Sequence, residues 1–222
     1  MTEVTSDGQV KEDKLSRMDF HFTEIIGEGG YGKVWKVEHL KTRGIFAMKE
    51  MSKALIIMKK SVDNIMNELK ILANLNNPFI ANMRCAFNDR DNLYLGMDYL
   101  PGGDFRSFLA DSERLSEEQC KFFICCILKA IEYLHKNKIF HRDIKPENLV
   151  IDEQGYLRIT DFGIARSQKD KQGLDTSGTP GYMAPEVICK QVHSYPVDFY
   201  AVGIIAYELM MGKRPYIGQN RN

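Results

Sequence analysis

The apolar pattern of this chain changes its period part-way along, and that change limits the folds open to it. Between Phe20 and residue 97 most apolar runs are strand-like: FHFTEIIG, KVWKVEHL and IFAMKEM, then 83–87 and 93–97. The stretch LPGGD at 100–104 then breaks the pattern. The residues that follow are mainly helical in pattern, so an α+β fold is expected. It would have a small antiparallel-sheet lobe at 20–98 and a mainly helical lobe at 99–222, after a polar N-terminal extension at 1–19.

Three segments have the patterns of helices. Apolar residues recur three and four apart over 62–75, and this pattern stops at the Asn-Asn-Pro that follows. Ser116 and Gln119 form a capping box, which predicts a helix over 117–135. The third segment, 197–211, is apolar on nearly every side, as in a fully buried helix.

Charge and cysteine content exclude several classes of protein. The net charge is zero, which does not indicate nucleic acid or an anionic membrane as the main partner. The five cysteines are odd in number and lack CxxC spacing, so neither a disulfide framework nor a zinc site is expected. The longest apolar stretches are too short to span a bilayer, and the polar N-terminus lacks an apolar signal region. A soluble cytoplasmic protein without membrane insertion is the expectation.

A glycine-rich stretch, GEGGYGKV at 27–34, is followed by a strand pattern rather than a helix. Glycines there would let backbone amides approach phosphate oxygens, although an ordinary turn is an equally good interpretation of this motif alone. Lys49 follows on the next strand, where a half-buried lysine needs a negative partner such as a phosphate or Glu68. Taken singly, a lysine reaching solvent and a solvated glutamate are the better interpretations.

The loop HRDIKPEN at 141–148 changes this balance, because it concentrates charged and amide side chains between a helix and a strand. Asp161-Phe162-Gly163 and Ala184-Pro185-Glu186 follow in order. From about Phe20 to Tyr216 the chain resembles the catalytic domain of the eukaryotic protein kinases, and it has every catalytic motif of that family in order. The resemblance implies a two-lobed kinase fold and ATP-dependent phosphoryl transfer.

The resemblance also implies catalytic roles. Asp143 matches the base that orients the substrate hydroxyl, and Lys145 the cation near the γ-phosphate. Lys49 matches the lysine on the α- and β-phosphates, with Glu68 as its orienting partner. Thr179 matches the threonine that braces Asp143 and Lys145. The two magnesium ligands are matched by Asn148 and Asp161, which both offer hard oxygens.

An ATP site follows from the same resemblance. The phosphate loop is matched by Gly27, Glu28, Gly29, Gly30 and Gly32, and the apolar walls of the pocket by Val34, Ala47 and Leu149. Met97 matches the back of the pocket, Asp98, Tyr99 and Leu100 match the hinge, and Asp104 matches the ribose position. The set also includes Lys49, and Glu147 of the catalytic loop.

The substrate class is implied by the loop motifs. Lys145 in DxKPxN and the stretch GTPGYMAPE resemble serine/threonine kinases, and AMKEMSK with NLYLGMDYLPGGDF resembles the AGC group. Three acids, Asp104, Glu147 and Glu208, lie where that group reads basic substrate residues, so a protein substrate that is basic around the acceptor is expected. The simpler alternative gives each acid a purely structural place.

The stretch DTSGTPGYMAPE matches an activation segment. Arg142 and Arg166 match cations that grip a phosphate there. Counting back from Thr179 places the usual phosphate position at Asp175, whose carboxylate would partly replace it, with Thr176 and Ser177 as alternative phosphosites.

The resemblance stops before the last helices of a kinase domain. The chain ends at Asn222, so the helical lobe is expected to lack those helices and to expose one side of 197–211 to a partner. Three interpretations remain: a fragment of a full kinase, a kinase completed by another chain, or a non-catalytic ATP-binding or scaffold module.

Overall fold

A computed structural model describes residues 15–112, 114–167 and 176–216. The chain divides into two compact units. The first unit contains residues 1–61 and 83–99, and the second contains residues 62–82 and 100–222. The boundary between lobes at residues 98 and 99 stays a prediction.

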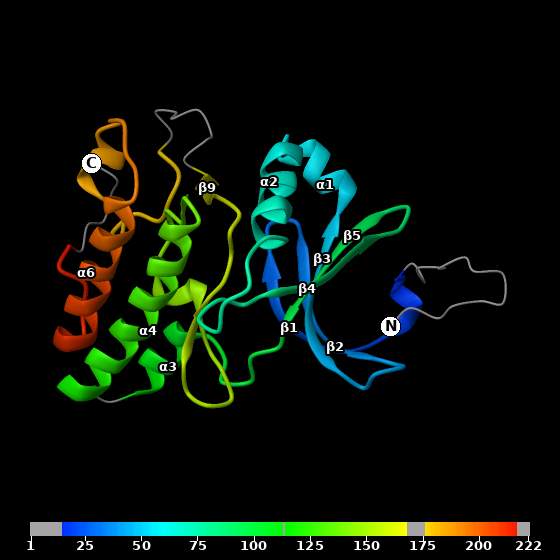
Figure 1. Cartoon of the computed structure of the whole chain (residues 1–222), viewed down its shortest axis with the longest axis horizontal. Helices are drawn as coiled ribbons and strands as arrows, with labels where there is room; N and C mark the ends of the chain where they lie inside the picture. The colour runs from blue at the N-terminus through cyan, green and yellow to red at the C-terminus, as the bar shows by residue number, and fades with distance from the viewer. Residues whose placement is uncertain (1–14, 113, 168–175, 217–222) are drawn as a thin grey trace. The chain divides into compact units, whose positions relative to one another are not determined.

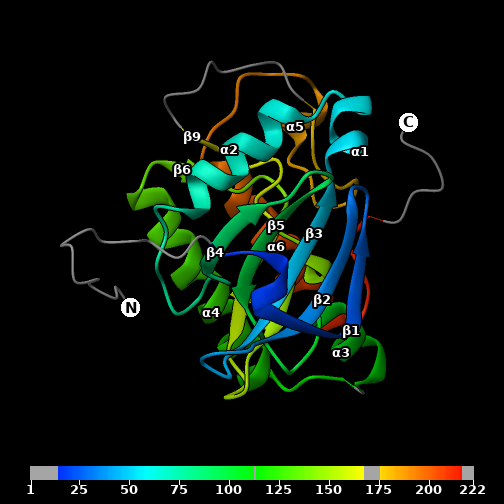
Figure 2. The same cartoon turned by 90° about the vertical axis from the view of Figure 1, so that its right-hand side faces the viewer.

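The first unit is built on a sheet of five antiparallel strands in the order β1-β2-β3-β5-β4 (Figure 1). Figure 2 looks onto this sheet and shows the strands side by side. Every strand predicted for this part of the chain forms. The elements are η1 (Arg17–Asp19), β1 (Phe20–Gly29), β2 (Gly32–His39), β3 (Ile45–Ser52), α1 (Lys53–Met58), β4 (Met83–Asn88) and β5 (Asn92–Asp98).

One face of this sheet carries an aromatic core. Phe87 stacks on Phe20 with ring centroids 5.5 Å apart and on Tyr94 at 4.9 Å. Val37 and Met48 complete the buried cluster. Because side chains alternate between the faces of a strand, the residues between these core positions lie on the opposite face.

The second unit is mainly helical. Its two longest helices, α4 and α6, lie side by side (Figure 1). The elements are α2 (Val62–Leu72), α3 (Phe105–Asp111), α4 (Glu117–Lys136), β6 (Ile139–Phe140), η2 (Pro146–Asn148), β7 (Leu149–Ile151), β8 (Leu157–Ile159), β9 (Arg166–Ser167), α5 (Pro185–Ile188) and α6 (Pro196–Met211).

The start of α4 is fixed by the predicted capping box. The Gln119 amide donates to the Ser116 hydroxyl at 3.2 Å, and the Ser116 amide donates to the Gln119 side chain at 2.8 Å. Two of the amides that a helix start leaves without a helical partner are thereby satisfied. The helix begins at Glu117, as expected.

Helix α6 is apolar on both sides, and the described structure buries only part of it. Val202, Ile205 and Leu209 are buried, whereas Phe199 is 51% exposed and Met211 53% exposed. The expected exposed side is therefore present, and a partner that covers it stays a prediction. No helix in the described residues is both long and apolar enough to cross a membrane.

Several short elements escaped the sequence pattern. They include α1, α3, α5 and the β6–β9 pair, in which Ile139 and Phe140 pair with Ser167 and Arg166. Elements of two to seven residues are too short to show a helical or strand period.

Candidate active site

The loop between β6 and η2 places Asp143 in a triangle of hydrogen bonds with Lys145 and Thr179. The Lys145 ammonium donates to Asp143 Oδ2 at 2.8 Å and to the Thr179 hydroxyl at 2.7 Å. That hydroxyl donates to Asp143 Oδ1 at 2.7 Å. Thr179 comes from a segment more than thirty residues away, so folding has brought together three residues that were predicted to act together.

Asn148 supports the same carboxylate. Its side-chain amide nitrogen donates to the Asp143 carbonyl at 2.9 Å and to Asp143 Oδ2 at 3.1 Å. Burial opposes ionisation of Asp143, but the bonds from Lys145 and Thr179 outweigh it and hold the pKa of this carboxyl below its usual value. Asp143 is therefore an anion at neutral pH and can accept a hydrogen bond from a hydroxyl.

Asp198 of α6 holds the backbone of this loop. It is completely buried and accepts from the amides of His141 at 3.0 Å and Arg142 at 2.8 Å. His135 of α4 bonds to the same carboxylate at 2.9 Å. Arg142 has a φ of +71°, a left-handed conformation that side chains rarely adopt, and these bonds compensate for its strain.

Asp198 was not among the residues predicted from the sequence. The available signal was an acid in the first turn of a mostly apolar helix. A buried charge needs partners to offset its desolvation. That signal shows that partners exist, but it does not say which residues they are.

The DFG segment packs behind the loop. The Phe162 ring lies edge-on to the His141 ring, with centroids 5.0 Å apart. His141 Nε2 lies 3.0 Å from the Thr160 carbonyl, and the Asp143 amide donates to His141 Nδ1 at 3.3 Å. This pattern fits a neutral imidazole with its proton on Nε2. His141 and Phe162 are both fully buried, so they form a rigid base for the site.

Asp161 is exposed and has a φ of +56°. Its Oδ1 accepts from the Gly163 amide at 3.1 Å, which fixes the turn. A Cβ added to Gly163 would lie 3.1 Å from Asp161 Oδ1 and 3.8 Å from Glu68 Oε2. The buried carboxylate of Glu68, on α2, therefore lies close to this turn.

The donor set fits magnesium rather than a softer metal. Mg²⁺ prefers a few hard oxygen ligands and keeps other positions for water or phosphate oxygens. Asp161 offers a carboxylate, and Asn148 offers an amide oxygen on the side of the amide group away from Asp143. Among the described residues no group of three His, Cys, Asp or Glu side chains could hold a metal ion by itself.

In the first unit, four of the predicted nucleotide-binding residues lie on one face of the sheet. Val34 pairs with Lys49, and Ala47 pairs with Met97. Paired residues share a face, and so do residues two apart on a strand. The shared face is therefore the one opposite the aromatic core, and it presents a lysine among apolar side chains.

The glycine-rich stretch forms the turn between β1 and β2. Gly29 pairs with Gly32, with Gly30 and Tyr31 between them. A Cβ on Gly32 would lie 2.0 Å from the Glu50 carbonyl oxygen, so the backbone of β3 excludes any side chain there. Gly27 and Glu28 pair with Val34 and Lys33.

The remaining predicted site residues have structural partners. Leu149 is fully buried at the start of β7, and Asp98 forms an ion pair with Arg84. Asp104 is the N-cap of α3 and accepts from the Ser107 amide at 2.8 Å and hydroxyl at 2.7 Å. Leu100 is half-buried and is the first residue of the segment 100–222, which belongs to the second unit.

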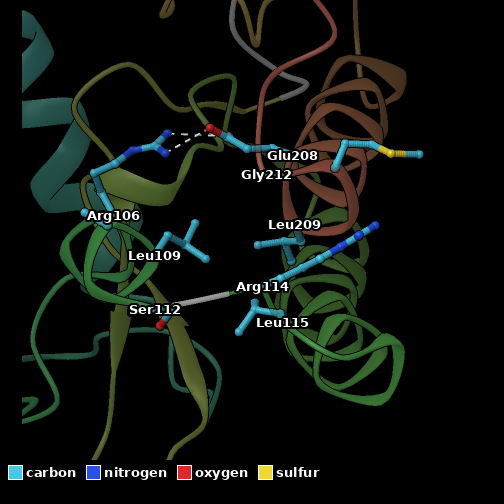
Figure 3. Close-up of a pocket in the computed structure, with 10 residues that line it drawn as sticks. Arg106, Leu109, Ser112, Arg114, Leu115, Glu208, Leu209 and Gly212 are labelled. Carbon is cyan, nitrogen blue, oxygen red and sulfur yellow. Dashed lines mark hydrogen bonds and ion pairs between the residues drawn. The ribbon is translucent and has the colours of Figure 1, made fainter.

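Two of the predicted substrate-reading acids share a partner that sequence analysis missed. Arg106 Nε donates to Glu147 at 2.9 Å, and its Nη1 donates to Glu208 at 2.9 Å. Figure 3 shows the arginine and Glu208 facing each other across the gap between α3 and α6. Below them lie Leu109, Leu115 and Leu209, which line a pocket of about 590 Å³.

The activation segment is described only in part. Arg142 Nε donates to the Ile164 carbonyl at 2.8 Å, and Arg166 bonds to Asn64 at 3.4 Å. Thr176 is exposed and Ser177 is half-buried. Asp175, the predicted stand-in for a phosphate, lies outside the described residues.

Comparison with known families gives an independent result. The model of the protein kinase domain matches residues 20–222. The chain belongs to the protein kinase domain family. The two-unit α+β architecture agrees with that family, so the predicted fold class is confirmed.

Individual kinases are similar over most of this kinase domain. A human serine/threonine-protein kinase 32B is 40% identical over 203 residues, which are 89% of this chain and 49% of the relative. The cAMP-dependent protein kinase catalytic subunit of Dictyostelium discoideum is 39% identical over 89% of this chain and 30% of the relative. Serine/threonine-protein kinase sgk-1 of Caenorhabditis elegans is 38% identical over 92% of this chain and 45% of the relative. The chain spans between 24% and 49% of the length of the curated relatives that it matches.

Proposed function

We propose that this chain is an ATP-dependent serine/threonine protein kinase, which transfers the γ-phosphoryl group of ATP to protein hydroxyls. The observation that carries the proposal is the arrangement of Asp143, Lys145, Thr179 and Asn148 within one unit, with distances of 2.7–3.1 Å. It combines an ionised acceptor for a hydroxyl proton with a cation for developing negative charge. The kinase family and the serine/threonine kinases among its relatives support the same assignment.

The chemistry follows from the residues. Asp143 accepts a hydrogen bond from the substrate hydroxyl and aligns its oxygen for in-line attack. Lys145 is held on Asp143 and Thr179, from which its ammonium stabilises negative charge on the transferred group. The Thr179 hydroxyl bonds to both groups and holds them in fixed positions relative to each other. Magnesium, when bound by Asn148 and Asp161, supplies charge neutralisation on the phosphate oxygens.

Other residues are proposed to bind the nucleotide. In the first unit the face with Val34, Ala47, Lys49 and Met97 offers apolar surface for a base and a cation for phosphates. The turn at Gly29–Gly32 offers the backbone amides of three glycines, which have no side chain. The resemblance to protein kinases implies that Glu68 is the orienting acid for Lys49, and this role stays a prediction.

The non-catalytic alternative has no observation in its favour. A binding module would need the nucleotide residues but not the bonded set of Asp143, Lys145 and Thr179.

Protein serine or threonine hydroxyls are the proposed acceptors. A preference for basic residues around the acceptor depends on the state of Arg106, which occupies two of the acids.

The test is phosphotransfer from labelled Mg-ATP to serine, threonine and tyrosine peptides. We expect transfer to serine and threonine, and a loss of about 10²- to 10⁴-fold in kcat for Asp143→Asn, which keeps the side chain's shape but removes the base. Melting temperatures of both proteins control for folding. Nucleotide binding without transfer in the wild-type chain would establish the binding module instead.

A further inference from the structure

A partly buried charged cluster joins α3, α6, η2 and the loop that carries Tyr182 in the second unit. Arg106 donates to Glu147 and Glu208, each at 2.9 Å, and also to the Tyr182 hydroxyl. That hydroxyl donates to the second oxygen of Glu208 at 2.6 Å. Figure 3 shows the two bonds between the arginine fork and Glu208. Both carboxylates therefore bond to the same cationic side chain, that of Arg106.

The cluster is connected directly to the catalytic groups. Glu147 lies between Lys145 and Asn148 in the sequence. Tyr182 donates its amide to the Thr179 carbonyl at 3.1 Å. An extended peptide advances about 3.3 Å per residue, so residues a few positions from a hydroxyl on Asp143 can reach this region. The cluster is therefore placed to interact with the flanks of a substrate.

Arg106 makes the contacts that a substrate arginine would make. A guanidinium is a planar fork that matches carboxylates. Arg106 donates from Nε and Nη1 to the two carboxylates and from Nη2 to the Tyr182 hydroxyl. The Glu208 side chain is only 11% exposed, so its bond to Arg106 is shielded from water, whereas Glu147 is 45% exposed. Burial opposes the charge of Arg106, but the bonds to Glu208 and Glu147 outweigh it and raise the pKa of the guanidinium.

A substrate arginine would have to compete with this tethered one. A group fixed within the same chain has an effective concentration in the millimolar range or above. Its displacement would also leave the arginine without its shielded partner. A substrate arginine could still pair with Glu147, which is the more exposed of the two acids. Such an exposed ion pair is weak.

We propose that Arg106 is a specificity-determining residue that occupies the acidic subsite of Glu147 and Glu208 in place of a substrate arginine. The chain therefore phosphorylates serine and threonine substrates without requiring a basic residue before the acceptor. This inference rests on the proposed kinase function. It also explains how the chain can have two acids of a basic-substrate subsite and not use them for that purpose.

The experiment compares serine peptides that differ only by Arg or Ala, one position at a time before the acceptor. The measured quantity is the ratio of kcat/KM for the Arg peptide to that for the Ala peptide. For the wild-type chain we expect a ratio below about 5 at every position, the value of an exposed ion pair. A wild-type ratio of tenfold or more at any position would overturn the proposal.

The decisive variant is Arg106→Gln, which vacates the acids while keeping a polar side chain. The ratio should rise by about tenfold or more at one position, as expected for a charge-assisted bond to a shielded carboxylate. Arg106→Lys keeps the charge but loses the fork, and it should give a smaller rise. Arg158→Gln is the matched control, because Arg158 pairs with Asp152 away from the cluster, and its ratio should equal the wild-type ratio.

A second variant links the gain to the acid. Adding Glu208→Gln to Arg106→Gln should return the ratio toward the wild-type value. An unchanged ratio in both Arg106 variants, with transfer to the Ala peptide intact, would overturn the role of Arg106 and leave the kinase function standing. If neither peptide is phosphorylated by the wild-type chain, the proposed function itself fails.

Discussion

At the scale of single residues, the site depends on the ionisation state of Asp143. Lys145 and Thr179 each bond to a different oxygen of its carboxylate, and together they offset the unfavourable effect of burial. Because the pKa in the folded state is below the unfolded value, the ionised group stabilises the folded chain above the unfolded pKa. This contribution is lost as the pH falls through the folded pKa.

Thr179→Val should therefore raise the pKa of Asp143, because it removes one of the hydrogen bonds that favour the anion. The acid limb of kcat/KM, which reports on the free enzyme, should move to higher pH. The measurement is a pH–rate profile of the variant and the wild-type chain.

Thr176→Val is the control, since that hydroxyl lies in the same segment but is exposed. Its acid limb should coincide with that of the wild-type chain. An equal shift in both variants would show that the bond from Thr179 is not the cause.

At the scale of elements, α6 supports the catalytic loop through one carboxylate. Asp198 accepts from two loop amides and bonds to His135 of α4, so a helix, a neighbouring helix and a loop meet at one buried group. The capping box of α4 and the positions of the strands β1 to β5 along the chain were predictable from nearby residues. The bonds of Asp198 were not, because its partners lie 56 to 63 residues away.

Asp198→Ala should lower the free energy of unfolding by about 3–5 kcal/mol, because it leaves two buried amides and a histidine without their acceptor. Urea denaturation is the measurement. Glu132→Ala removes exposed ion pairs of α4 and should change the same quantity by less than about 1 kcal/mol. Similar losses in the two variants would contradict the assigned role.

The β1–β2 turn allows a second test at this scale. Gly32→Ala would bring a methyl group within 2.0 Å of the Glu50 carbonyl, so the backbone must shift. We expect a loss of about 2 kcal/mol or more in unfolding free energy.

Gly30→Ala is the matched control in the same turn. Its nearest neighbour would be the flexible end of Lys59 at 3.4 Å, so thermal denaturation should show a much smaller effect. If both glycines tolerate alanine equally, the close approach of the β3 backbone does not limit this position.

At the scale of the whole molecule, nucleotide binding should appear as a change in thermal stability. A ligand that binds only the folded protein stabilises it by mass action. Mg-ATP at a hundred times its dissociation constant should add about 2.7 kcal/mol to the free energy of unfolding. In a chain of this size, that should raise the melting temperature by about 5–10 °C. Differential scanning calorimetry measures the shift.

The shift should be smaller with EDTA, and smaller in Asp161→Asn, which loses the carboxylate proposed for magnesium. The melting temperature without nucleotide should stay near the wild-type value in that variant, because Asp161 is exposed. Equal shifts with and without magnesium would remove Asp161 from the metal site.

The sequence by itself determined the family, the strands from Phe20 to Asp98, the start of α4 and the identity of the motif residues. Each of these depends on residues close together in the chain, where spacing and side-chain chemistry are enough. Even the set of Asp143, Lys145 and Thr179 was predicted only because its motifs are recognisable one by one.

The tertiary structure alone decided what the remaining charged groups do. It turned Asp198 toward the loop backbone and placed Arg106 on Glu147 and Glu208, across sequence separations of 41 and 102 residues. A sequence pattern shows that a buried charge must be satisfied, but packing chooses its partner. For the two acids, that choice decided whether they face a substrate or an arginine of the same chain.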